Sequence, residues 1–198
     1  MHIAITGSIG SGKSSVSRIL KSLGYPVFDA DSLAKAQYER PEVKQALNDY
    51  FQEDLYPHGI FDPARLSTLI FEDPRPEARH FVEALIHPLV LSVLDELAKT
   101  SGQTIVFSEV PLLYEAHGED QFDRVLLVTC DEDVADKRLM EQRGMTLKEI
   151  RRRRGLQLNP SVKAALADDV IENNGDEVQL VKQVTQYSDK IKSKYGKK

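Results

Sequence analysis

Short apolar runs alternate along the chain with longer segments in which apolar residues recur every three or four positions. Five of these runs have strand length and apolar, largely β-branched character: 2–6, 26–28, 104–107, 124–129 and 169–171. The first run is followed by a glycine-rich turn and by a helical pattern that ends near Gly24. Because apolar strands alternate with helices, we expect a parallel sheet covered on both faces, with ligand-binding residues at the carboxyl ends of its strands.

The alternation stops between residues 32 and 99, where the pattern is mostly helical. Asp62-Pro63 predicts the start of a helix, and 73–76 contains turn residues. A further helix is expected to begin at His87-Pro88 and to carry an apolar stripe over 86–97. With 198 residues, the chain has room for one domain with a smaller insertion, and this helical stretch is its expected place.

The last third of the chain returns to alternating elements. A helix is expected over 132–143, and Thr146 with Glu149 has the form of a capping box that begins the next helix. The closing helix is expected to pack through one side, which carries Val178, Val181, Val184 and Ile191. The basic tail 192–198 is expected to fray.

Composition narrows the class of protein. The net charge is −5, which disfavours a broad basic face for nucleic acid, and apolar residues make up 41% of the chain, as in ordinary globular proteins. A single cysteine, Cys130, excludes an intrachain disulfide or a cysteine-cluster zinc site. The chain has no long apolar run and no leader-like N-terminus, so we expect a cytoplasmic protein.

The turn after the first strand carries a phosphate-binding motif. Residues 7–14, GSIGSGKS, fit G-x-x-x-x-G-K-S/T without a mismatch. Glycines let backbone N–H groups approach phosphate oxygens, Lys13 supplies a positive charge, and the Ser14 hydroxyl can ligate Mg²⁺. An apolar strand precedes the motif and a helix follows it, as the mechanism requires. The motif therefore predicts binding of a nucleoside triphosphate.

Other features indicate which class of phosphate-loop protein this is. The D-x-x-G and N/T-K-x-D motifs of GTPases are absent from the sequence, and ATPase motors usually have a larger domain. A compact sheet, a helical insertion and a late basic segment are instead typical of a small kinase, with a core, an acceptor-binding insertion and a lid.

Acidic residues follow two of the predicted strands. Asp29 and Asp31 lie at alternate positions, so in an extended chain one of them could face the γ-phosphate and accept the proton of an attacking hydroxyl. They could equally be turn and cap residues at a helix start. Glu109 ends the third strand, where it could order Mg²⁺ or be an ordinary strand-end charge.

A basic segment interrupts the acidic chain. Residues 143–154 carry a net charge of +5, including four consecutive arginines at 151–154. Such residues stabilise the transferring phosphoryl group in kinase lids, but they could also form a solvated helix face or a nucleic-acid or nuclear-localisation patch. His87, taken alone, is more often a cap or surface residue than a ligand.

Taken in order, six segments resemble the dephospho-CoA kinase family. They are 5–14 (ITGSIGSGKS), 29–31 (DAD), 86–88 (IHP), 111–115 (PLLYE), Arg153 with Gln157 and Lys163, and 167–175 (ADDVIENNG). They span almost the whole chain. Ser8, Tyr114 and Glu109 depart from the commoner glycine, phenylalanine and aspartate of the family, but no required chemical group is lost.

The resemblance implies an α/β, three-layer P-loop kinase fold with a parallel five-stranded sheet, a helical substrate-binding insertion and a helical lid. The nucleotide-binding core would comprise 1–31, 100–137 and 164–198, the acceptor subdomain 32–99 and the lid 138–163. The enzyme would use ATP and Mg²⁺ to phosphorylate the ribose 3′-hydroxyl of dephospho-CoA, the last step of coenzyme A biosynthesis. Nucleic acids and membranes are not expected as partners.

The resemblance also implies roles for single residues, with Asp31 as the general base. The catalytic residues would be Asp31, Lys13, Arg143 and Arg153. Nucleotide contacts would come from Gly7, Ile9, Gly10, Ser11, Gly12, Lys13, Ser14, Ser15, Arg138 and Asn173. Acceptor contacts would come from Asp31, Arg65, His87 and Tyr114, and metal contacts from Ser14 and Glu109. Two rivals remain: another small-hydroxyl kinase, and a regulatory or RNA-binding module.

Overall fold

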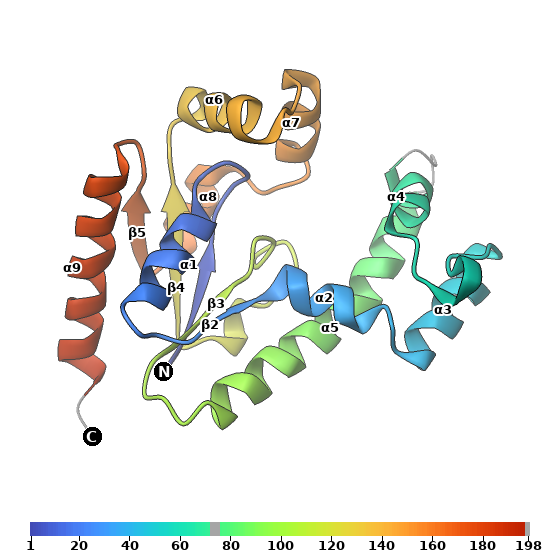
Figure 1. The fold of residues 1–198 in the computed structure, drawn as a ribbon, viewed down its shortest axis with the longest axis horizontal. Helices are drawn as coiled ribbons and strands as arrows, with labels where there is room; N and C mark the ends of the chain where they lie inside the picture. Colours follow the sequence, from blue (N-terminus) through green and yellow to red (C-terminus); the bar gives the residue numbers. More distant parts are fainter. Residues whose placement is uncertain (72–75, 197–198) are drawn as a thin grey trace. The chain divides into compact units, whose positions relative to one another are not determined.

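The computed structural model describes residues 1–71 and 76–196, and the chain divides into two compact units, residues 1–29 with 95–198 and residues 30–94. The first unit contains a parallel five-stranded sheet in the order β2-β3-β1-β4-β5 (Figure 1). Its strands are β1 (His2–Thr6), β2 (Val27–Asp29), β3 (Val106–Glu109), β4 (Arg124–Thr129) and β5 (Asp169–Glu172). All five lie at or within one or two residues of the predicted runs, and the predicted parallel sheet is confirmed.

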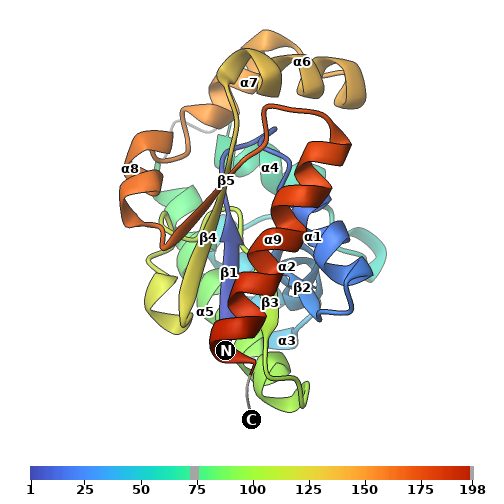
Figure 2. The ribbon, with the colours of Figure 1, turned by 90° about the vertical axis from the view of Figure 1, so that its left-hand side faces the viewer.

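Helices cover both faces of this sheet. The first unit contains α1 (Lys13–Ser22), η2 (Glu119–Gln121), α6 (Glu132–Arg143), α7 (Leu147–Arg154), α8 (Pro160–Leu166) and α9 (Glu177–Tyr195). Helices α1 and α9 lie side by side on one face and α8 lies on the other (Figure 2). The main apolar core fills the space between the sheet, α1 and α9, with β1 supplying Ile3 and Ile5, both fully buried. Each such side chain stabilises the fold by about 1.5–3 kcal/mol.

The closing helix α9 differs from its prediction. Its buried residues are Leu180, Val184, Tyr187, Ser188 and Ile191. Val178 and Val181 are 78% and 41% exposed, so half of the predicted apolar stripe was wrong. The stripe that packs keeps the 3.6-residue period through a tyrosine and a serine, which a search for aliphatic residues passes over. The helix also continues to Tyr195, beyond the expected start of fraying.

The second unit is helical. It contains α2 (Ala30–Gln37), α3 (Pro41–Phe51), η1 (Pro57–Gly59) and α4 (Pro63–Phe71), and α5 (Pro76–Thr100) continues from it into the first unit. The predicted start of α4 is confirmed, because Asp62 Oδ1 accepts hydrogen bonds from the backbone N–H groups of Ala64 and Arg65.

Helix α5 begins earlier than its apolar stripe suggested. Pro88 lies inside the helix, so the predicted start at His87-Pro88 was wrong. A proline lacks the N–H of an internal helical bond and is therefore commonest in a first turn, which misled the prediction. Burial of Val82 before the proline and Val90 after it favours one continuous helix. The turn signal at 73–76 falls mainly outside the described residues.

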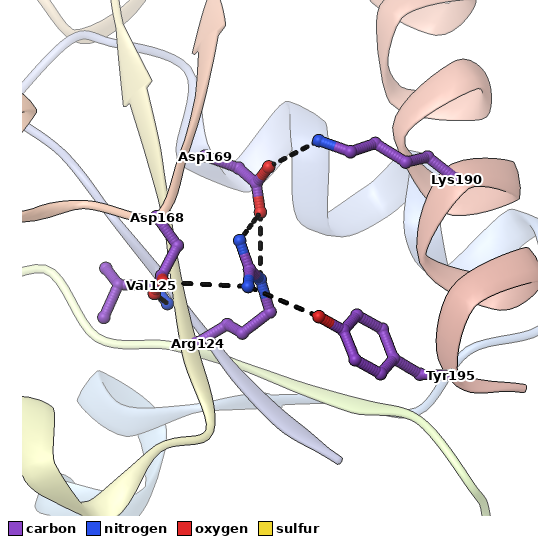
Figure 3. A network of polar contacts seen from close by, with 6 residues as sticks. All are labelled: Arg124, Val125, Asp168, Asp169, Lys190 and Tyr195. Carbon is purple, nitrogen blue, oxygen red and sulfur yellow. Dashed lines mark hydrogen bonds and ion pairs between the residues drawn. The ribbon is translucent and has the colours of Figure 1, made fainter.

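A polar network ties α9 to the sheet (Figure 3). Arg124 donates to Asp169 at 2.9 Å, and Lys190 on α9 donates to the other carboxylate oxygen at 2.9 Å. Burial would raise the pKa of Asp169, but the hydrogen bonds and charges of these two cations outweigh it and lower the pKa. Arg124 and Asp169 are the first residues of β4 and β5. The network therefore lies at the amino ends of the strands, whereas the phosphate loop lies at their carboxyl ends.

Within the described part of the chain, no helix has both the length and the apolar character that crossing a bilayer requires.

Candidate active site

The phosphate loop lies at the carboxyl edge of the sheet, where the strand order reverses. β1 is the central strand, and the chain proceeds from it to β2 on one side and later to β4 on the other. Such a reversal leaves a crevice outside the carboxyl ends of parallel strands. The residues that follow these ends include the phosphate loop, Cys130 and Asn173, while Asp29 and Glu109 are register partners at the ends of β2 and β3.

Gly12 shows why the loop needs glycine. Its φ is +95°, and it immediately precedes α1, so the positive end of the helix dipole faces the loop. A Cβ at this position would lie 2.1 Å from Asn173 Nδ2. The backbone conformation and the close approach of Asn173 therefore both exclude a larger residue.

The Lys13 side chain closes over the loop. It is buried, and its Nζ donates to the backbone oxygens of Gly7 at 2.7 Å and Ser8 at 3.0 Å. The ammonium is therefore held within the turn that the motif assigns to phosphate. This is the position from which a positive charge can reach phosphate oxygens.

Two side-chain amides from distant parts of the chain hold the same loop. Asn173 Nδ2 donates to Ser11 O at 2.9 Å, and Gln157 Oε1 accepts from Ile9 N at 2.9 Å. Arg138 donates to Asn173 O at 2.9 Å. The predicted nucleotide residues Arg138 and Asn173 thus lie against the loop and support it. No function was assigned to Gln157 from the sequence. It lies 148 positions from Ile9 along the chain, so no sequence pattern reveals that the two residues are in contact.

A hydroxyl and a carboxylate meet near the start of α1. Glu109 Oε2 accepts from Ser17 Oγ at 2.7 Å, and Ser17 lies one helical turn after Ser14. No group of three or more His, Cys, Asp and Glu side chains that could hold a metal exists in residues 1–71 and 76–196. Mg²⁺ in kinases needs only one or two protein oxygens, since phosphates and water complete its shell. Ser14 and Glu109 fit that requirement.

Asp31 lies in the first turn of α2, in the second unit. The idea that Asp29 and Asp31 share a side of an extended chain was wrong, because the helix already begins at Ala30. The covalent chain nevertheless keeps Asp31 within two residues of the carboxyl end of β2. Its assignment as a base therefore rests on this position and on the family resemblance.

The arginines of the basic segment differ in their surroundings. Arg154 pairs with Glu132 at 3.2 Å and with Asp136, both on α6, and so joins α6 to α7. Arg143, at the end of α6, and Arg153, on α7, are exposed. Arg151 and Arg152 are exposed as well, so exposure alone does not distinguish Arg143 and Arg153 from them, whereas Arg154 joins two helices.

The predicted acceptor residues lie in both units. In the second unit, Arg65 pairs with Glu53 at 2.6 Å, and His87 lies half-buried within α5, where burial lowers the pKa of the imidazole. In the first unit, Tyr114 is buried and its hydroxyl has no hydrogen-bond partner among the residues described here. Burial raises the pKa of Tyr114 to about 12, so the hydroxyl stays neutral.

Comparison with known proteins agrees with the sequence and the site. A family model for dephospho-CoA kinase matches residues 1–179. A dephospho-CoA kinase of Thermobifida fusca is 36% identical over 183 residues, which cover 91% of this chain and 90% of the relative. The crystal structure of TT1252 from Thermus thermophilus has a TM-score of 0.83 at 34% identity and 95% coverage of both chains.

The fold is also that of a more distant kinase. A dephospho-CoA kinase structure from Campylobacter jejuni has a TM-score of 0.72 at 22% identity, with 96% of both chains covered. The expected P-loop kinase fold is thereby confirmed. By sequence over most of its length, with the complete phosphate loop described above, this chain belongs to the dephospho-CoA kinase family.

Proposed function

We propose that this kinase transfers the γ-phosphate of ATP to the ribose 3′-hydroxyl of dephospho-CoA, giving coenzyme A and ADP. The observation that carries the proposal is the complete phosphate loop, closed by Lys13 Nζ, in a chain that the dephospho-CoA kinase family model matches over 1–179. A cytoplasmic location belongs to the same proposal and agrees with the single free thiol, Cys130.

The loop would bind the triphosphate. Its backbone N–H groups and the amino end of α1 favour anions, and Lys13 Nζ, held beside the carbonyls of Gly7 and Ser8, would place its positive charge next to phosphate oxygens. Mg²⁺, when bound with ATP, neutralises phosphate charge, and Ser14 and Glu109 would hold it.

The acceptor side would use Asp31 and the second unit. The Asp31 carboxylate would orient the 3′-hydroxyl and accept its proton as the oxygen attacks phosphorus. Arg143 and Arg153, in the proposed lid 138–163, would face the charge that builds on the transferring phosphoryl group. The proposed acceptor subdomain, 32–99, includes Arg65 and His87, and Arg65 would exchange Glu53 for an anionic group of the substrate.

The acceptor test is direct. The purified protein is incubated with ATP and Mg²⁺ and with dephospho-CoA, AMP or shikimate, and ADP and the phosphorylated product are measured. We expect product with dephospho-CoA and little with the other two. A clear preference for AMP or shikimate, or no transfer to dephospho-CoA, would contradict the proposed substrate.

The role of Asp31 needs a separate variant. Asp31→Asn should bind ATP normally and lose at least about 100-fold in kcat, the usual contribution of a general base. Asp49→Asn, which changes an exposed carboxylate of α3 in the same unit, is the control and should keep wild-type turnover. Near-normal kcat for Asp31→Asn would remove Asp31 from the mechanism.

A further inference from the structure

The connection between α7 and α8 is tied to the core at two adjacent residues. Gln157 Oε1 accepts the backbone N–H of Ile9 at 2.9 Å, and the backbone N–H of Leu158 donates to Glu115 Oε1 at 2.8 Å. One bond reaches the phosphate loop and the other reaches the loop after β3. The connection therefore joins two segments that lie far apart in the sequence.

Glu115 is held in turn by a buried lysine. The Lys163 side chain is 0% exposed, and its Nζ lies 2.7 Å from Glu115 Oε1, on a carboxylate that is 13% exposed. A buried cation is tolerated only with a close counter-charge, so this pair fixes α8 against the loop that carries Glu115. Asn159 caps α8 by accepting from Ser161 N at 2.9 Å. The residues that follow Gln157 are thus placed independently of the phosphate loop.

The contact of Gln157 is made to one particular peptide group. The N–H of Ile9 and the C=O of Ser8 belong to the same planar, trans peptide, so they point in opposite directions. The Ser8 oxygen accepts from Lys13 Nζ at 3.0 Å and from Ser11 N at 3.2 Å. An acceptor that fixes the Ile9 N–H consequently aims the Ser8 carbonyl at Lys13.

We propose that Gln157 is a positioning residue of the phosphate loop: it orients the Ser8–Ile9 peptide and, through the Ser8 carbonyl, the ammonium of Lys13. Glu115 and Lys163 keep the Gln157 side chain at the loop. Without the Gln157 acceptor, the peptide can rotate and the loop is less preorganised for phosphate. The inference rests on the proposed function in one respect only, namely that Lys13 binds the phosphates of ATP.

Gln157→Met tests this role, because methionine keeps the length of the side chain and removes the strong acceptor. We expect the dissociation constant for ATP, measured by calorimetric titration, to rise about tenfold, as for loss of one well-formed hydrogen bond. KM for dephospho-CoA should stay within twofold. Hydrogen exchange of the Ile9 amide, followed by NMR in the absence of ligand, should accelerate.

Two further variants complete the design. Gln157→Glu keeps an acceptor oxygen and should restore slow exchange at the Ile9 amide. Gln183→Met, on α9, removes a comparable side-chain amide bond at the protein surface, from Gln183 Nε2 to Glu172 O at 3.0 Å. It should leave ATP binding and Ile9 exchange unchanged.

Other outcomes would overturn the inference. An ATP dissociation constant for Gln157→Met within twofold of wild type, or unchanged exchange at Ile9, would show that the contact does not position the loop. An equal loss of affinity for ATP and acceptor with a lower melting temperature would show a merely structural role. If dephospho-CoA is not phosphorylated by the wild type, yet Gln157→Met still weakens ATP binding, the proposed function fails and this inference stands.

Discussion

Gly12→Ala is the substitution whose consequences the structure defines most closely. At φ +95° an alanine is in the left-handed region, which costs roughly 1–2 kcal/mol. Its Cβ would also lie 2.1 Å from Asn173 Nδ2, and the buried Asn173 side chain could retreat only by giving up its 2.9 Å bond to Ser11 O. Losing that bond costs about 0.5–1.5 kcal/mol, and more if the Ser11 oxygen stays buried and unpaired.

Gly24→Ala is the matched control. Gly24 has a similar φ, +88°, but a Cβ there would meet no atom within 4 Å. The control therefore carries only the backbone cost, part of which is offset because alanine restricts the unfolded chain by about 0.4–1 kcal/mol. We expect Gly24→Ala to lower the free energy of unfolding by about 1 kcal/mol and Gly12→Ala by about 2–3 kcal/mol.

Urea unfolding measures the difference in the free energy of unfolding, and titration with ATP measures the affinity of the site for the nucleotide. ATP affinity should fall at least about tenfold in Gly12→Ala, because the loop that cradles phosphate is displaced, and stay unchanged in Gly24→Ala. A double-mutant cycle isolates the close approach: in an Asn173→Ala background the extra cost of Gly12→Ala should largely disappear. Equal losses for both glycine variants, or an undiminished cost in the Asn173→Ala background, would refute the reasoning.

Three further predictions concern stability. The pKa of His2 is lowered to about 4, chiefly by burial, so the unfolded chain takes up a proton first as the pH falls. Stability should be complete above about pH 6.5 and decrease towards pH 4 by at most about 1.4 kcal/mol per pH unit, a slope that His2→Gln should flatten in urea titrations. Lys163→Met leaves the Glu115 carboxylate buried without its cation and should cost about 3–5 kcal/mol in chemical denaturation, whereas a cost below about 1 kcal/mol would contradict the buried pair. Asp62→Ala removes the cap of α4 and should cost about 1 kcal/mol, with no change in ATP affinity.

The elements that the sequence predicted well are those with local causes. The start of α4 follows from Asp62 and its two capping bonds, and the Thr146–Glu149 capping box appears as expected. The phosphate loop was recognisable because its glycines and lysine act within one short turn. Local rules failed at Pro88, where burial on both sides outweighs the missing hydrogen bond of the proline.

By itself, the sequence determined the strands, the order of alternating elements, the phosphate loop and the family, because each depends on residues close together or on motifs in a set order. The tertiary structure alone decided which side chains meet at the loop. Gln157 reaches Ile9 across 148 positions, and Glu109 reaches Ser17 across 92. No periodic pattern in the sequence indicates such contacts. They form because the carboxyl ends of parallel strands all lie at one end of the sheet, where residues that are distant in the chain come within hydrogen-bonding distance of one another.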